Sequence, residues 1–524
     1  MPSSPTSEKI TLTYPLFCAD FLDADRLVVG GGGGEGRSGV GNRITLLDVS
    51  KSTAAQSATT TNIQQLSQHD LSASEDSCMT LVVARAPISK KKSKGKTAQP
   101  LLLAGINSSE AQQREGTNEH FRVFSVAAGS DNAISPVSRG QLFTPTTTDV
   151  YQRVLRTRGS LAAAASGGGK SGFEVVVVST DDFAVKRRIS TETEVADLDL
   201  AEDGTLVYCT SKEIFTTAGS GASTPKKLNF QTTPAIPGTL RAIRFLSRER
   251  MVAVINAPQR SGSEILLLDA TSGGIVARRK LHKGVGAVTS LDVVSLSPTG
   301  GEGAIAVAGA DQSVEILVAE DAARLHTAHV FKDLHPFQIS KVVFSPAPEP
   351  PVVTHDAEDE ETPQAPQQHV IRVATTSIGN TVVVHTLPLI DSGKGRGYTL
   401  LRSGAVLRQT AISVLLSLIA VVVFAALLQM VFVARGGLTG LQGISDMLPP
   451  IPGMGGHTHT TTATTAGTVK ESDVDALIEG MKSGAVTDPF DGGNVVDEDE
   501  IREELLKKVV AAADDIAHSK KDEL

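Results

Sequence analysis

The chain has 524 residues and a net charge of −9, and 40% of its residues are hydrophobic and 20% charged. This composition is typical of a folded chain and excludes wholesale disorder. Three cysteines in a chain of this length exclude a disulfide-built scaffold. Residues 436–524 hold 7 Lys/Arg and 17 Asp/Glu, a net of −10, which leaves +1 for residues 1–435. A nearly neutral N-terminal part argues against nucleic acid as a partner.

Residues 1–392 are expected to form one all-β domain. Short runs of β-prone residues alternate with Gly, Pro, Ser and Asp turns throughout this region. Seven units of several strands can be recognised, and the last four begin 45, 48 and 51 residues apart. The units start with LFCADF (16–21), CMTLVV (78–83), VYQRVL (150–155), VADLDL (195–200), LRAIRF (240–245), VTSLDV (288–293) and ISKVVF (339–344).

A seven-bladed β-propeller accounts for this repeat, because each small sheet can bury its faces only against its neighbours. The strand ITLTY, which begins at Ile10, precedes the first unit and is expected to pair with the last blade and close the ring. A large β-sandwich or two separate β-domains are the alternatives. The Trp–Asp dipeptide typical of many propeller blades is absent, since the chain has no Trp.

A glycine-rich segment, GGGGGEGRSGVGN at 30–42, separates two neighbouring strands of the first unit. Ordering five consecutive glycines costs conformational entropy, so such a run is usually a flexible linker. A short turn would suffice here, however, and glycine backbone can turn its carbonyl and amide groups toward an ion or a partner. A protruding loop of this kind is a candidate functional site.

The sequence predicts no enzyme of bond-making or hydrolytic chemistry. Gly169-Lys170-Ser171 resembles the end of a phosphate-binding loop, but Ala164 stands where the first Gly is needed. A strand, FEVVVV, follows where that motif requires a helix.

A juxtamembrane linker (393–408) is followed by an uncharged, apolar segment at 409–434. Its 26 residues, at about 1.5 Å each, exceed the ~30 Å hydrocarbon core of a bilayer and predict a transmembrane helix. A buried core helix is the alternative. Four basic residues lie shortly before the segment, whereas only Arg435 lies close behind it. This excess of positive charge places the N-terminal side in the cytosol.

The tail, residues 435–524, is expected to be largely disordered and lumenal. It ends in Lys521, Asp522, Glu523 and Leu524, the retention signal that the KDEL receptor reads in the endoplasmic reticulum (ER). The flanking charges and the signal agree on topology. They predict a single-pass ER membrane protein with a cytosolic N-terminus, a lumenal C-terminus, and cycling to the early Golgi.

The chain resembles the ER-anchored WD-repeat guanine-nucleotide exchange factors that activate the Sar-type small GTPase and start COPII coat assembly. The resemblance rests on Tyr14-Pro15, on FLDADRLVVGGGGGEG with Asn42 before the next strand, on EVADLDLAEDGTLVYCTS (194–211), on SVEILVA in the sixth unit and on the single span. It covers roughly the first 435 residues.

The resemblance implies that the glycine loop engages the GTPase and that Asn42 is the main exchange residue, with Glu35 in the loop core. Gly41 stands where relatives often have Pro. The implied partner-binding residues are Gly30, Gly31, Gly32, Gly33, Gly34, Gly36 and Asp76. No cofactor is expected to be required, and the resemblance implies a structural potassium ion bound through the backbone of Gly31, Gly32, Gly33 and Gly34.

Two functions remain open from the sequence. The first is an exchange factor that speeds GDP release and GTP loading, and so promotes ER-to-Golgi vesicle transport. The second is a non-catalytic, ER-tethered propeller scaffold that uses the same loop to bind cargo or coat proteins. A lumenal enzyme would require the inverted topology.

Overall fold

The computed structural model divides the chain into two units, residues 1–409 and 410–524, and nearly all described residues lie in the first. No helix among the described residues is long and apolar enough to cross a membrane. Except for 397–401 and 424, the predicted linker, span and tail lie outside the described residues, as does the retention signal. The structure describes residues 4–36, 38–50, 63–85, 100–127, 129, 131–144, 149–170, 172–230, 237–298, 300–349, 369–392, 397–401 and 424.

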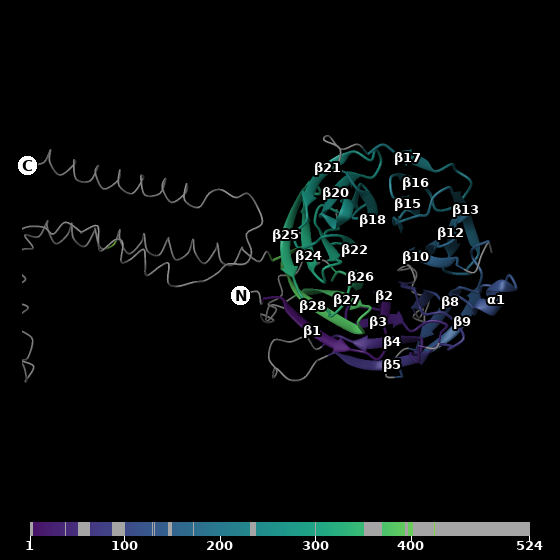
Figure 1. Ribbon diagram of the computed structural model, residues 1–524. Coiled ribbons are helices and arrows are strands. Elements are labelled where there is room, and N and C mark those ends of the chain that lie inside the picture. Colours follow the sequence, from purple (N-terminus) through teal and green to yellow (C-terminus); the bar gives the residue numbers. More distant parts are fainter. Residues whose placement is uncertain are drawn as a thin grey trace, which may run out of the picture. The chain divides into compact units, whose positions relative to one another are not determined.

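The described part of the chain is an all-β, seven-bladed propeller (Figure 1), as the repeat predicts, and the β-sandwich alternative is wrong. Blades 1 to 3 contain β2 (Leu16–Phe21), β3 (Arg26–Gly31), β4 (Arg43–Asp48) and β5 (Gln64–Asp70); β6 (Thr80–Ala84), β7 (Leu101–Gly105), β8 (Phe121–Val126) and β9 (Ile134–Gly140); and β10 (Tyr151–Arg158), β11 (Leu161–Gly167), β12 (Phe173–Ser179) and β13 (Val185–Thr191).

Blades 4 to 6 repeat this arrangement. They contain β14 (Asp197–Leu200), β15 (Thr205–Cys209), β16 (Ile214–Ala218) and β17 (Lys226–Leu228); β18 (Thr239–Phe245), β19 (Arg250–Asn256), β20 (Ser263–Asp269) and β21 (Ile275–Lys280); and β22 (Val288–Ser295), β23 (Gly303–Gly309), β24 (Val314–Glu320) and β25 (Arg324–Phe331). The described helices are the short α1 (Glu110–Arg114) and the 3₁₀ turn η1 (Pro258–Arg260).

Blade 7 joins the two ends of the domain. It contains β26 (Ile339–Phe344), β27 (Val370–Ser377) and β28 (Thr381–Asp391), and its outer strand is β1 (Thr6–Thr11) from the N-terminus. Ile10 pairs with Val382 in this antiparallel ladder, which confirms that an N-terminal strand closes the ring. The strand covers residues 6–11, however, and not 10–14 as the sequence predicts. A further strand, β29 (Tyr398–Leu400), pairs with the far end of β28. Because the outer strand comes from the other end of the domain, the sheet itself holds the ring closed.

Adjacent blades are joined by apolar packing and by carboxylates that are buried or half-buried. Between blades 1 and 2, Val28 and Leu46 pack with Leu81 and Leu102. On the inner strand of blade 1, the Asp20 carboxylate accepts a hydrogen bond of 2.7 Å from the Val83 amide of the next blade. The corresponding carboxylates of Asp199 and Asp292 accept bonds from Phe245 and Phe344, each 2.8 Å long. These bonds tie inner strand to inner strand in a chain that lacks the Trp–Asp signature.

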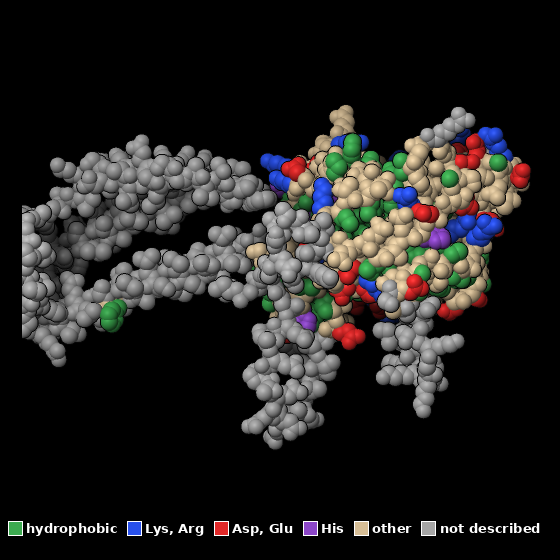
Figure 2. All heavy atoms as spheres, turned by 90° about the horizontal axis from the view of Figure 1, so that it is seen from below, with side chains coloured by type: hydrophobic (Ala, Val, Ile, Leu, Met, Phe, Trp, Pro, Cys, Tyr) green, Lys and Arg blue, Asp and Glu red, His purple; other side chains and the backbone are tan. Residues whose placement is uncertain are grey.

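The glycine loop and two neighbouring loops lie on one face of the disc, because consecutive strands of each blade are adjacent and antiparallel. In a four-stranded antiparallel blade, the connection between the second and third strands and the connection to the next blade lie at the same edge. The glycine loop (32–42), the segment 71–79 that leads into blade 2, and the segment 106–120 that carries α1 therefore share one face. On the surface seen in Figure 2, acidic and basic side chains of the described residues are interspersed, which fits the near-zero charge of residues 1–435.

Candidate functional site

The glycine loop is shaped by close contacts that only glycine permits. Gly32 has φ +142°, and a Cβ there would lie 2.2 Å from Oδ1 of Asn42. Gly34 has φ +76°, a left-handed conformation that a side chain rarely adopts. The run is therefore not a generic flexible linker: its glycines let the backbone pass against Asn42.

The predicted contact residues of the loop divide into a buried base and an exposed tip. Gly30 and Gly31 lie inside β3 and are buried, and a Cβ on Gly30 would lie 2.9 Å from the sulfurs of both Cys18 and Cys78. Gly32 is buried as well, whereas Glu35 and Gly36 are exposed. This leaves the tip, rather than the base, as the surface that a partner can reach.

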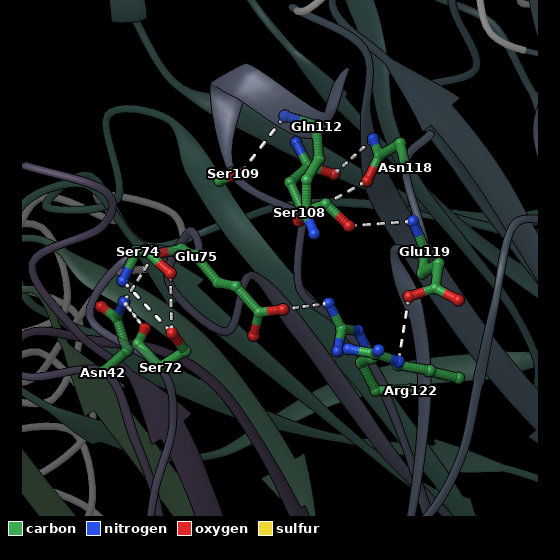
Figure 3. A network of polar contacts seen from close by, with 12 residues as sticks. Asn42, Ser72, Ser74, Glu75, Ser108, Ser109, Gln112, Asn118, Glu119 and Arg122 are labelled. Atoms are coloured by element: carbon green, nitrogen blue, oxygen red, sulfur yellow. Dashed lines mark hydrogen bonds and ion pairs between the residues drawn. The ribbon is translucent and has the colours of Figure 1, made fainter. Parts of the chain in front are cut away.

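Asn42, the predicted exchange residue, lies under the loop and is only 1% exposed. Its Oδ1 accepts a hydrogen bond of 2.9 Å from the Gly34 amide. Its Nδ2 donates to the carbonyl of Glu75 at 2.8 Å and to that of Ser72 at 3.3 Å. All polar groups of this carboxamide are thus engaged within the chain. In this conformation Asn42 holds the glycine loop to the segment 71–79. Figure 3 shows its contacts with Ser72 and Glu75 of that segment.

A largely buried ion pair extends this network into blade 2. The Glu75 carboxylate lies 2.7 Å from Nη2 of Arg122 on β8, and the two side chains are 14% and 9% exposed (Figure 3). The backbone of Glu75 receives the Asn42 amide while its side chain is fixed by Arg122. Sequence reasoning missed this pair, because the two residues lie 47 positions apart with no local motif to connect them.

The tip of the glycine loop contacts blade 2 at a second point. The Glu35 carboxylate accepts a 2.5 Å hydrogen bond from the amide of Glu110, the first residue of α1. The side chain of Ser109 caps this helix by accepting from the Gln112 amide. Ser108 accepts from the Glu119 amide at 3.0 Å, which fixes the end of the segment (Figure 3). The loop and α1 together form one composite surface.

The predicted partner-binding residue Asp76 lies beside the loop and is half-buried. Its Oδ1 accepts a 2.7 Å bond from the Ser77 amide and would lie 3.1 Å from a Cβ on Gly34. None of the described residues donates a hydrogen bond to the carbonyl oxygens of Gly32, Gly33 or Gly34. Backbone carbonyls and a carboxylate are oxygen ligands that suit a potassium ion. These residues fit the predicted cation, whereas Gly31 is paired with Arg43 inside the sheet.

A cavity of about 270 Å³ lies between the outer strands β5 and β9, next to this network. Its lining includes Ser72, Glu75 and Arg122, together with the apolar Phe124 and Val137. The Nε of Arg122 is buried and has no hydrogen-bond partner among the described residues. Space beside the ion pair therefore lets its side chains rearrange if the pair is broken.

No protein-family model matches the chain. The guanine nucleotide-exchange factor SEC12 of Candida glabrata is 26% identical over 339 residues, which cover 64% of this chain and 66% of SEC12. SED4 of Candida glabrata is 24% identical over 64% of this chain, and SED4 of Saccharomyces cerevisiae is 25% identical over 66%. The matched part spans just under two thirds of SEC12, and 30% and 29% of the two SED4 proteins.

Among solved structures, Raptor of Chaetomium thermophilum is 12% identical with a TM-score of 0.48, over 74% of this chain and 29% of Raptor. The homologues of this chain are thus SEC12 and SED4 guanine nucleotide-exchange factors, and its seven-bladed propeller is consistent with the WD-repeat exchange-factor family.

Proposed function

We propose that this chain is a guanine-nucleotide exchange factor for a Sar-type small GTPase at the ER membrane, where it starts COPII vesicle formation. Homology to SEC12 supports the exchange role. The observation that carries the proposal to this chain is the glycine loop, which is held by Asn42 and displayed beside α1 on one face of the propeller.

The mechanism requires no covalent chemistry. An exchange factor binds the nucleotide-free GTPase more tightly than the loaded form, so it speeds GDP release and lets GTP enter. The exposed tip around Glu35 and Gly36 makes the contact, and Asn42 fixes the loop in advance. Preorganisation lowers the entropy cost of binding. Asn42 therefore acts by positioning the loop in the unbound protein. To contact the GTPase directly, the Asn42 side chain would have to exchange its hydrogen bonds within the chain for new ones.

A potassium ion fits the same loop, held by the carbonyls of Gly32, Gly33 and Gly34 with Asp76 beside them. When bound, it would supply positive charge beside these oxygen atoms and stiffen the loop. The Asn42 carboxamide and the Glu75 backbone carry out the positioning through bonds within the chain.

Membrane placement is proposed from the sequence features described above. A single span at 409–434 with a cytosolic propeller puts the loop where a cytosolic GTPase can reach it. The C-terminal Lys-Asp-Glu-Leu tail would then be read in the lumen by the KDEL receptor. Anchoring raises the effective concentration of the factor at one membrane.

The test is release of a fluorescent GDP analogue from a Sar-type GTPase by the purified full chain in detergent micelles. We expect clear acceleration with the wild type and loss of most of it in Asn42→Ala. A thermal-unfolding measurement on the same variant checks that the fold is retained. Binding without acceleration would favour the scaffold function, and protease protection of the propeller in microsomes would overturn the proposed topology.

A further inference from the structure

An apolar patch stands exposed on two connected loops of blade 7. Phe337 is 60% exposed and Ile378 is 43% exposed, and Phe337 is the most exposed large hydrophobic residue among the described residues of the propeller. Pro336 beside it is also exposed. The Ile378 amide donates to the carbonyl of Gln338 at 3.3 Å, so the two loops lie side by side. We call Pro336, Phe337 and Ile378 the blade 7 patch.

The loops under this patch are held rigidly. The buried Ser377 hydroxyl lies 2.9 Å and 3.0 Å from the carbonyls of Phe337 and Gln338, to which it donates, and it accepts from the Gly379 amide at 3.0 Å. His335, only 5% exposed, makes hydrogen bonds of 2.6 Å and 2.8 Å to two buried threonine hydroxyls. The scaffold thus fixes the backbone that presents the patch.

A fixed, exposed aromatic residue is poorly explained by folding alone. Burying a Phe side chain stabilises a folded chain, and Phe337, at 60% exposure, forgoes much of this gain in the isolated chain. Rigid aromatic anchors are typical of binding hot spots, because little entropy is lost when a partner covers them. The patch therefore has the properties of a contact surface.

The blade 7 patch lies on the same face as the glycine loop. Residues 332–338 lead into the first strand of blade 7, and residues 378–380 connect its second and third strands, which is the edge that carries the glycine loop in blade 1. Leu12 donates to the carbonyl of Asn380 at 2.7 Å, and Gly32 donates to the carbonyl of Pro15 at 3.0 Å.

The short segment from Leu12 to Pro15 limits the distance between the blade 7 patch and the glycine loop. Leu12 and Pro15 are three residues apart and can span at most about 11 Å. A standard protein interface covers ~800 Å² on each partner, a disc about 30 Å across. One partner of ordinary size that engages the glycine loop can therefore also cover the patch.

We propose that the blade 7 patch is a second contact for the small GTPase that engages the glycine loop, and that it meets an apolar area on that GTPase. This inference rests on the proposed function. The patch lies to one side of the loop, so its role is to hold the GTPase rather than to open its nucleotide site. Removing it should raise KM for the GTPase and leave kcat unchanged.

The test compares the full-chain double variant Phe337→Ser/Ile378→Ser with the wild type over a range of GTPase concentrations. We expect KM to rise at least tenfold, as for loss of a hot spot, with an unchanged kcat and an unchanged unfolding temperature. The matched control is Val185→Ser/Val276→Ser, which removes two valines that are 47% and 38% exposed on the outer strands β13 and β21. The control should behave as the wild type.

Binding of the nucleotide-free GTPase, measured in parallel, separates the possible failures. If the wild type accelerates exchange and the double variant has the same KM, the patch inference is wrong and the proposed function stands. If the wild type binds the GTPase through the patch without accelerating exchange, the proposed function fails and the patch stands. Absence of binding overturns both. A wild-type dimer that the double variant converts to a monomer would assign the patch to a second copy of the chain and overturn the inference.

Discussion

The ion pair between Glu75 and Arg122 gives the sharpest test of how the glycine loop is held. In Arg122→Met, the largely buried Glu75 carboxylate loses the cation 2.7 Å away. Breaking a buried pair by removing one partner typically costs 3–5 kcal/mol. The adjacent 270 Å³ cavity lets the carboxylate turn toward water, so we expect the low end, about 3 kcal/mol.

This cost should be visible in urea unfolding, and the double variant Glu75→Gln/Arg122→Met should recover part of it because no charge is then left buried. Nucleotide release should slow several-fold in Arg122→Met at a temperature where the chain is still folded, since the Glu75 backbone that receives the Asn42 amide is no longer fixed.

The control is Arg139→Met, whose partner is Glu119 and whose side chain is 58% exposed; it should cost less than ~1 kcal/mol. A loss below ~1 kcal/mol in Arg122→Met, with exchange unchanged, would refute the positioning argument.

Two further predictions concern the glycine loop and the acid stability of blade 2. Gly32→Ala should destabilise the chain by more than ~1 kcal/mol and make the loop more sensitive to protease, because its Cβ would overlap the Asn42 carboxamide; an unaffected urea midpoint would contradict this. His120 is buried, its Nε2 accepts from the amides of Leu142 and Phe143, and burial lowers its pKa from 6.5 to about 4. Its contribution to stability is therefore complete above pH 6.5 and is lost as pH falls toward 4. Relative to His120→Gln, which cannot titrate, the wild type should lose about 3 kcal/mol of unfolding free energy between pH 7.5 and 4. Parallel pH curves for the two proteins would show that the histidine does not carry this effect.

The order of strands and turns along the chain is enough to predict the architecture of the propeller. The seven predicted starting runs overlap the inner strands β2, β6, β10, β14, β18, β22 and β26, and the closing strand β1 includes Ile10. These features could be predicted because strand alternation and turn residues are local, and because the repeat multiplies a weak local signal seven times.

The glycine loop is also evident in the sequence, but the way in which it is held depends on contacts between blades. The family resemblance implied that Asn42 acts on the partner, whereas in this conformation its side chain is turned inward under Gly34. Its anchor, Glu75, depends on Arg122 in the next blade, and the loop tip reaches the start of α1, 75 residues away. Such contacts depend on how neighbouring blades pack and on the register of one blade against the next. No local pattern in the chain encodes them, because the partners come together only when the ring closes.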